Sequence, residues 1–272
     1  MKIALIQQTA SENKTKNLKK GLESIDKAAA NGANIIVFAE LAFEPFYPQF
    51  PAGHNKNQLA ETIDGQIITA LRESAVKNKV VIIPNFFELK DGKTYDSSPV
   101  INIDGNILGV TRMKHIPDYA FFHEKTYYTP GNESIEVFQT AFGKIGIAIC
   151  YDRHYPEYMR ALGIAGAEIV IVPQAGAIGE WTDGLYEAEL QIPAFQNGYF
   201  TALCNRVGRE QNLDFSGESF VCSPNGEIIA RASQSKEEIL YAVLELNDIS
   251  QSHARNLFYP DRRPEIYSKW FS

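Results

Sequence analysis

The sequence is poor in cysteine and in basic charge. Only three of its 272 residues are cysteines, Cys150, Cys204 and Cys222, and no Cys-x-x-Cys pair occurs, so neither a zinc ribbon nor a disulfide framework is predicted. Acidic residues outnumber basic ones by 33 to 26, and the net charge of −7 favours neither nucleic acid nor an anionic membrane surface as a partner. No run approaches the roughly 18 apolar residues of a membrane span, and no apolar N-terminal stretch ends at a small-residue cleavage site. We therefore expect a cytoplasmic protein with reduced thiols.

Two pairs of segments resemble each other and indicate an internal repeat. Residues 2–8 (KIALIQQ) resemble residues 144–150 (KIGIAIC), and residues 32–40 (GANIIVFAE) resemble residues 166–174 (GAEIVIVPQ). All four are almost continuously apolar, as strands buried on both faces are, and a helical pattern lies between the members of each pair. Each half therefore reads as a β-α-β unit. We expect an α/β fold with an approximate two-fold repeat and with helices packed outside β-sheets.

Further elements follow from shorter signals. The dipeptides at 104–105 (Asp-Gly) and 225–226 (Asn-Gly) lie between apolar runs and predict hairpins. Residues 65–78 and 187–197 have the patterns of helices, and residues 80–83 and 200–205 those of strands.

The ends of the buried strands carry the first candidate site residues. Glu40 and Cys150 end two of these strands and Gln174 ends a third, and ligands in α/β sheets gather beyond the carboxyl ends of strands. A strand-turn-helix around Cys150 suits covalent catalysis, because backbone amides at a helix start favour a thiolate and bind an oxyanion. The alternatives are a glutamate that has already reached solvent and an inert buried thiol, and we adopt the inert-thiol interpretation for the other two cysteines.

A thiol of ordinary pKa needs a base. The five histidines form no metal-spaced cluster, so no metal site is predicted, but a Cys-His dyad using His115 or His154 stays open. The other candidate base is Glu40, with a second carboxylate in the loop 123–128. Spacing alone does not choose between them.

Three landmarks, taken in order, resemble a known family. Together with residues 127–131 (YYTPG) and 205–208 (NRVG), they are similar to the nitrilase, or carbon–nitrogen hydrolase, superfamily over essentially the whole chain, and nearest to its N-carbamoyl amino acid amidohydrolase and β-ureidopropionase branches. The landmarks are residues 38–40 (FAE), 112–117 (RMKHIP) and 149–153 (ICYDR). The resemblance implies a four-layer α-β-β-α sandwich, in agreement with the repeat, and a Glu-Lys-Cys triad that uses no cofactor.

The resemblance also implies individual roles. It makes Cys150 the nucleophile, Glu40 the base that takes the thiol proton and later activates water, and Glu124 a second glutamate that orients the substrate. The lysine is the exception. The family pattern is Arg-Lys-x-His, whereas this chain has Met113 in the lysine position and Lys114 one residue later.

A shift of one residue turns a side chain to the opposite face of a strand. Lys114 therefore completes the triad only if a local bulge turns it back. Otherwise Lys114 is a solvated lysine, and Arg112 or His115 supplies the positive charge instead.

Four residues are expected to bind the substrate. Arg153 presents a planar fork of donors that fits a carboxylate, and in the resemblance the N-carbamoyl amino acid hydrolases have arginine here, whereas carbamoylputrescine hydrolases tend to have glutamine. The alternative for Arg153 is a salt bridge to Asp152 or Glu157. The other three residues expected to bind substrate are Tyr151, His115 and Gln174.

The predicted function is that of a cofactor-free thiol amidohydrolase. It cleaves a linear carbon–nitrogen bond other than a peptide bond through a covalent acyl-enzyme, with a small N-carbamoyl amino acid or similar anionic amide as substrate. The alternatives are an aliphatic amidase, a carbamoylputrescine-type hydrolase, or a protein that binds a ligand or partner without turnover, which Met113 keeps open. A true nitrilase is disfavoured, because Tyr-Asp rather than Trp-Glu follows Cys150.

The composition predicts one domain over residues 1–272. Hydrophobic residues make up 44% and charged residues 22%, as in globular proteins, and no linker-like stretch divides the chain. We expect residues 1–254 to form the sandwich core. Residues 255–272 form a C-terminal tail rich in arginine, proline and aromatics, a composition typical of interfaces. This predicts a homodimer or a higher homo-oligomer, the alternative being a tail packed on its own domain.

Overall fold

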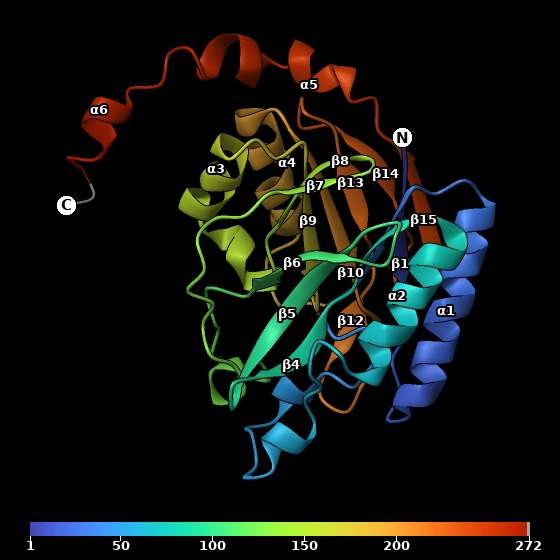
Figure 1. The fold of residues 1–272 in the computed structure, drawn as a ribbon. Helices are drawn as coiled ribbons and strands as arrows, with labels where there is room; N and C mark the ends of the chain where they lie inside the picture. The colour runs from blue at the N-terminus through green and yellow to red at the C-terminus, as the bar shows by residue number, and fades with distance from the viewer. Residues whose placement is uncertain (271–272) are drawn as a thin grey trace.

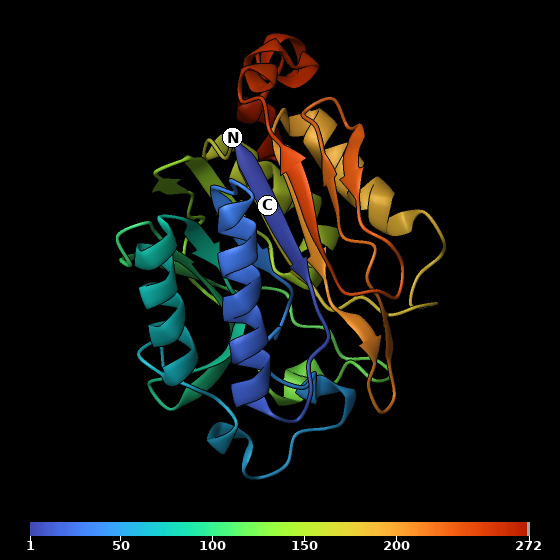
Figure 2. The same cartoon turned by 90° about the vertical axis from the view of Figure 1, so that its right-hand side faces the viewer.

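Two β-sheets face each other, and a pair of helices covers the outer face of each. The computed structural model describes residues 1–270. Figure 2 shows the layers from the side, with α1 (Lys14–Ala30) and α2 (Gln66–Asn78) outside one sheet and α4 (Leu185–Asn197) outside the other, where α3 (Pro156–Ile164) packs beside it. The prediction of an α-β-β-α sandwich is confirmed, and the helices expected at 65–78 and 187–197 are present (Figure 1).

The first sheet holds seven strands in the order β15-β1-β2-β3-β5-β4, with β6 paired to β5. Its strands are β1 (Lys2–Gln7), β2 (Ile35–Phe38), β3 (Val81–Ile83), β4 (Phe86–Lys90), β5 (Lys93–Ile101), β6 (Ile107–Arg112) and β15 (Glu238–Val243).

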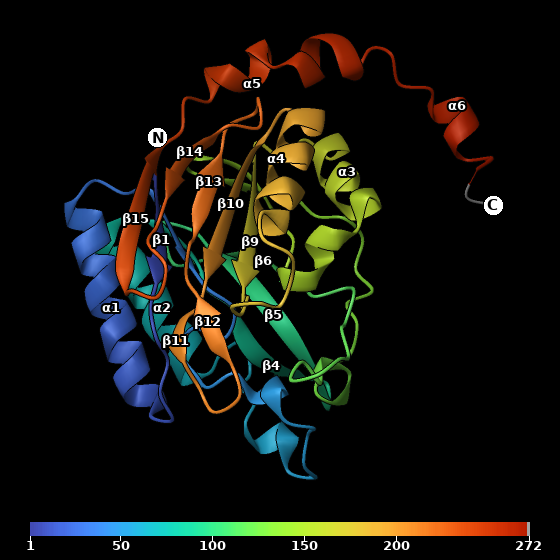
Figure 3. The same ribbon diagram turned by 180° about the vertical axis from the view of Figure 1, so that it is seen from behind.

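The second sheet holds six strands in the order β14-β13-β10-β9-β8-β7, and Figure 3 shows it from the side of α3 and α4. Its strands are β7 (Phe138–Thr140), β8 (Gly143–Ile147), β9 (Ile169–Gln174), β10 (Phe200–Asn205), β13 (Phe220–Cys222) and β14 (Ile228–Arg231). A separate two-stranded ribbon joins β11 (Val207–Arg209) to β12 (Asp214–Ser216).

The internal repeat is confirmed to the residue. Ile3 of β1 pairs in parallel with Ile35 of β2, and the corresponding Ile145 of β8 pairs in parallel with Ile169 of β9. Every residue of β2 is buried, as expected for a strand covered on both faces. The Asp-Gly and Asn-Gly hairpins are also present, between β5 and β6 and between β13 and β14.

The second cysteine belongs to the apolar layer between the sheets. Cys204 on β10 is fully buried, and its thiol lies 3.5 Å from the carbonyl oxygens of Ile6 on β1 and Val37 on β2. Burial raises the pKa of Cys204, and it raises that of Cys222 to about 11. Both thiols therefore remain neutral and serve as small core residues, as the sequence predicted.

The C-terminal segment leaves the sandwich after β15. It contains α5 (Asn247–Gln251), a short helical turn (Ala254–Phe258) and α6 (Pro264–Tyr267), and it arches over one end of the sheets before α6 stands away from the body (Figure 1). Its first part packs on α4, where the rings of Phe195 and Phe258 lie 5.2 Å apart. Leu257 and Trp270 are 53% and 64% exposed. The last two residues of the predicted tail, 271 and 272, lie outside the described part of the chain. None of the helices within residues 1–270 has the length and hydropathy needed to cross a membrane.

Candidate active site

The two sheets each contribute one end of the site. Glu40 follows β2 of the first sheet, and Cys150 follows β8 of the second. Glu124 comes from a short turn (Glu124–Thr126) between the two halves of the chain. Glu40 and Glu124 are fully buried, Cys150 is 5% exposed, and both carboxyl groups act electrostatically on the thiol. The structure thus brings together three residues that the sequence singled out from segments more than 25 residues apart.

Cys150 lies at a strained turn. Its φ of +44° is in the left-handed region, which residues other than glycine rarely adopt. The turn is held by the buried carboxylate of Asp152, which accepts hydrogen bonds from the backbone N–H groups of Ile149 and His115 at 3.3 and 3.0 Å. The strain presents the thiol at the start of a helical turn, as in the sharp elbows that expose catalytic nucleophiles.

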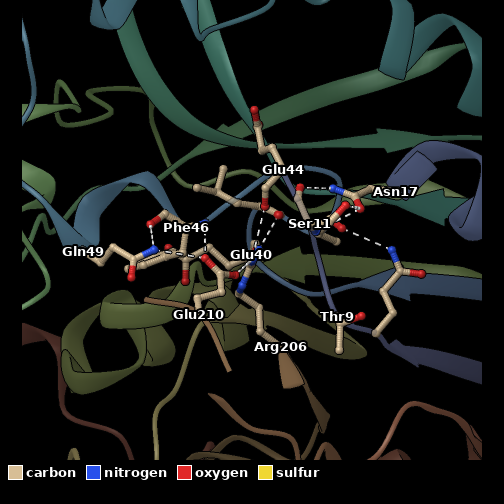
Figure 4. A network of polar contacts seen from close by, with 12 residues as sticks. Thr9, Ser11, Asn17, Glu40, Glu44, Phe46, Gln49, Arg206 and Glu210 are labelled. Carbon is tan, nitrogen blue, oxygen red and sulfur yellow. Dashed lines mark hydrogen bonds and ion pairs between the residues drawn. The ribbon is translucent and has the colours of Figure 1, made fainter. Parts of the chain in front are cut away.

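The backbone around Glu40 is held in a similar way. Leu41, with φ of +46°, donates its N–H to the side-chain oxygen of Asn85 at 2.8 Å. Arg206, which follows β10 of the other sheet, donates from its guanidinium to the carbonyl oxygens of Glu40, at 3.0 Å, and of Leu41 (Figure 4). Glu210 in turn accepts from Arg206. One buried arginine therefore fixes the position of Glu40 relative to the second sheet.

Burial sets the protonation of the two central groups. The pKa of Glu40 rises from its ordinary 4.5 to about 8, because the carboxylate is desolvated and faces the negative charge of Glu124. The pKa of the Cys150 thiol is raised well above its usual range by desolvation and then by Glu40 and Glu124, against the opposing effect of Arg153. The resting thiol is neutral and needs a base. A carboxylate with a pKa of about 8 suits that task near neutral pH.

Buried polar atoms without hydrogen-bond partners gather here. More than nine in ten buried polar groups in proteins are normally paired, so a concentration of unpaired ones indicates where a ligand binds. The unpaired atoms include both carboxylate oxygens of Glu40 and of Glu124, Oδ2 of Asp96, the Tyr128 hydroxyl, Nη2 of Arg153 and Nε2 of Gln174.

The prediction that Lys114 completes the triad is wrong. Its ammonium group donates to the carbonyl oxygen of Glu133 at 2.9 Å and lies 6.0 Å from the ring centre of Tyr158, away from Cys150. The bulge that would turn it inward is absent at this point. Instead the ladder of β6 continues regularly past Arg112, where Met113 donates its N–H to the carbonyl oxygen of Asp96 at 3.0 Å.

Strand alternation therefore buries Met113, at 1% exposure, in the position where the family has lysine. Neither of the two substitutes for the lysine takes its place. Both nitrogens at one edge of Arg112 bind Glu88, at 2.6 and 2.7 Å, and its third binds Glu133. His115 lies with Nδ1 2.7 Å from Asp152 and its ring stacked on Tyr155 at 3.5 Å, so it supports the elbow rather than facing the thiol.

Arg153 is buried directly behind the nucleophile. It donates to the carbonyl oxygen of Cys150 and to the side chain of Gln174, both at 2.8 Å, and its Nε pairs with Glu189 at 3.0 Å. The expected alternative of an ion pair is thus present in part, with Glu189 in place of Asp152 or Glu157. Nη2 is left without a partner, so Arg153 can still bind an anionic group.

Two residues at the mouth of the site were not found from the sequence. Glu180, in the loop after β9, accepts hydrogen bonds from the hydroxyl groups of Tyr119 and Tyr186, both at 2.6 Å, and its charge contributes to raising the pKa of Cys150. Tyr119 and Glu180 line a hollow of about 550 Å³, formed mainly by residues 119–122, 177–180 and 212–214. The ring of Tyr151 lies 6.4 Å from that of Tyr119, on the same aromatic wall. A lone acidic residue in a loop gave no signal of this placement.

A third residue, Asp96 on β5, was missed for another reason. It lies in a polar stretch, residues 93–98, that the sequence left outside the predicted strand, yet it is fully buried beside Glu40. Within residues 1–270, no group of three or more histidine, cysteine or acidic side chains is placed to hold a metal ion.

An α-β-β-α sandwich with a strained thiol between buried carboxyl groups at its sheet ends is the arrangement of thiol amidohydrolases. The family described as carbon-nitrogen hydrolase matches residues 2–254, and the chain belongs to that family, within the nitrilase superfamily. It is therefore a hydrolase of carbon–nitrogen bonds other than peptide bonds.

Several relatives are similar over nearly their full length. The chain is 34% identical to citrullinase of Francisella tularensis subsp. tularensis, over 99% of this chain and 97% of the relative. It is 33% identical to N-carbamoylputrescine amidase of Arabidopsis thaliana, over 97% and 93%, and 33% identical to β-ureidopropionase of the same plant, over 90% of this chain and 64% of the relative. The crystal structure of a carbon-nitrogen hydrolase from Helicobacter pylori G27 superposes with a TM-score of 0.93 at 30% identity, covering 100% of this chain and 98% of that one.

Proposed function

We propose that the protein hydrolyses the terminal ureido group of a small carboxylic acid, an N-carbamoyl amino acid, through a covalent intermediate on Cys150. The observation that carries the proposal is the unpaired, buried Nη2 of Arg153 directly behind the thiol. A guanidinium edge in that place fits a carboxylate. The ureido group is supported by the relatives, because citrulline, N-carbamoylputrescine and β-ureidopropionate all end in one.

The reaction begins with proton transfer. Ionised Glu40 takes the proton of Cys150 as the thiolate attacks the ureido carbonyl carbon, and the carbonyl oxygen becomes an oxyanion beside the backbone amide that follows Cys150. Glu124 accepts hydrogen bonds from the N–H groups of the ureido nitrogen and so orients the carbonyl carbon towards the thiolate.

The intermediate collapses when protonated Glu40 passes its proton to the leaving nitrogen. The carbon–nitrogen bond breaks, and a thiocarbamate on Cys150 remains. Glu40, ionised again, removes a proton from water as the water attacks the same carbon, which breaks the carbon–sulfur bond and returns the proton to the thiolate. The carbamic acid product loses carbon dioxide in solution.

A cationic ureido substrate is the second candidate. Glu180 places a carboxylate at the mouth of the site, held by two tyrosine hydroxyls, and a substrate ammonium group pairs with a carboxylate there. N-carbamoylputrescine, named for the Arabidopsis relative, carries such a group.

Four substrates separate the two candidates: N-carbamoyl-β-alanine, N-carbamoylputrescine, citrulline and a neutral aliphatic amide, each assayed for released ammonia. We expect the anionic ureido acid to have the highest kcat/KM. Arg153→Gln should lower kcat/KM for the acid by about 10², equivalent to about 3 kcal/mol of charge-assisted hydrogen bonding, and leave the neutral amide nearly unchanged.

Glu180→Gln is the matched variant and should affect only cationic substrates. Intact-protein mass after brief incubation should show a carbamoyl adduct on Cys150. Equal losses by Arg153→Gln on acid and amide would mean that the arginine only supports the elbow, and the anionic substrate would be withdrawn.

A further inference from the structure

A third carboxyl group faces the catalytic pair. Asp96 has no solvent exposure, and its Oδ1 accepts a hydrogen bond from the side-chain amide of Asn85. The same amide donates to the Ser98 hydroxyl at 3.1 Å. Asn85 is also the residue that holds the N–H of Leu41, next to Glu40. Asp96 is therefore fixed on the same support as the base.

The second oxygen of Asp96 and both oxygens of Glu40 are buried without a donor, although the two side chains interact directly. Ionised carboxylates are acceptors only, so two such groups in contact repel each other unless one keeps its proton. Within residues 1–270 neither group forms an ion pair.

The cation that would settle such a pair is absent from its usual place, because Met113 occupies it. Met113 and Asp96 are neighbours across the ladder of β5 and β6, joined by the backbone hydrogen bond of 3.0 Å. The acid thus lies on the adjacent strand, directly opposite the position from which a lysine side chain would enter.

We propose that Asp96 is a neutral carboxylic acid that donates its proton in a hydrogen bond to ionised Glu40, and so replaces the lysine ammonium group in stabilising the base. The inference rests on the proposed function only in taking Glu40 as the base. Asp96 acts through Glu40 and is a positioning residue. An O–H donor to a carboxylate forms a short, strong bond without adding positive charge, and the pair titrates as a unit.

The surroundings agree with a proton held between the two groups. Burial and the charge of Glu40 raise the pKa of Asp96 well above its usual range. Other negative groups discourage a second ionisation, and the nearest arginine binds the backbone of Glu40 rather than a carboxyl oxygen. The titratable and charged groups around the pair are Glu124, Tyr128, Glu44, Cys150, Asp152, Arg153 and Arg206.

Asp96→Asn tests the proposal, because asparagine keeps the size and a weaker donor but has no acid proton. The acid limb of the pH profile of kcat/KM reports the ionisation of the base in the free enzyme. We expect this limb to move up by about one pH unit, with about a tenfold loss of kcat/KM at pH 7 and a smaller loss at pH 9. Ser98→Ala is the matched control. It removes a bond to the same Asn85 amide and should lower stability without moving the limb.

Two further measurements make the result decisive. In Asp96→Asn/Met113→Lys the new ammonium group should take over from the acid and return the limb towards that of the unaltered protein. Infrared difference spectra between the unaltered protein and Asp96→Asn at pH 7 should contain the carbonyl band of a protonated carboxylic acid, and this readout needs no substrate.

The proposal fails if Asp96→Asn lowers stability but leaves the limb in place, or if no protonated-acid band is lost. A limb that moves down would show that Asp96 is ionised and repels Glu40. Absence of turnover with every substrate would count against the proposed function alone, because the infrared band still decides the state of Asp96.

Discussion

Replacing the base should make the protein more stable, and the gain should depend on pH. Glu40 binds its proton with a pKa of about 8 in the folded protein and about 4.5 when exposed. Below pH 4.5 the group is protonated in both states and costs nothing. As the pH rises, the unfolded chain releases the proton while the folded protein keeps it, so the unaltered protein loses stability until the pH passes about 8.

The size of this effect follows from the two pKa values. At about 1.4 kcal/mol for each tenfold change in proton affinity, the difference between them corresponds to about 5 kcal/mol. Glutamine has the shape of glutamate and no titration. The free energy of unfolding of Glu40→Gln, minus that of the unaltered protein, should therefore increase by up to about 5 kcal/mol between pH 5 and pH 9, while activity is lost.

Urea unfolding at each pH, at one protein concentration, measures this difference. Any fixed effect of the new amide is independent of pH, so the slope is the readout. Glu237→Gln is a control of opposite sign: the pKa of Glu237 is lowered by its hydrogen bond with Lys20, so that variant should lose stability relative to the unaltered protein as the pH rises. A difference for Glu40→Gln that stays constant from pH 5 to pH 9 would refute the reasoning.

Three other changes have clear expected outcomes. Cys150→Ala should abolish turnover in an ammonia assay, while Cys204→Ala should keep activity and lose about 1 kcal/mol of stability in urea unfolding; residual turnover by pure Cys150→Ala would exclude the thiol mechanism. Lys114→Ala should leave kcat/KM within about twofold, because its ammonium group binds Glu133 outside the site, and a large loss would return that lysine to the reaction. Truncation after Ser250 should lower the oligomeric mass in light scattering, since the tail has the composition of an interface, and an unchanged mass in folded protein would remove that role.

The fold was predictable where burial is continuous. Strands such as β2, covered on both faces, leave an unbroken apolar run in the sequence, and the repeat of Ile3 and Ile145 gave their order and register. The start of β5 was not predictable in this way. Its residues 93–98 are polar and buried because they pair with β4 and bond to side chains such as Glu88 and Asn85, which the sequence places elsewhere.

The site was predictable only in part, for a related reason. Glu40 and Cys150 end apolar strands, where a polar residue is conspicuous. Lys114 was the uncertain position, and strand alternation decided it. Asp96 and Glu180 lie in polar segments, and their importance depends on the absence of nearby cations, which no local pattern records.

The pairing of β1 with β15 has a consequence for how the chain is made. The two strands lie antiparallel along their whole length, from Lys2 opposite Val243 to Gln7 opposite Glu238. At synthesis rates of about 5–20 residues per second, the roughly 240 residues between them take about 10–50 s to appear. For that interval one edge of β1 has no partner, and its apolar, β-branched sequence is of the kind that associates with other exposed edges. Newly made chains therefore depend on low local concentration or on a chaperone until the final strand seals the sheet.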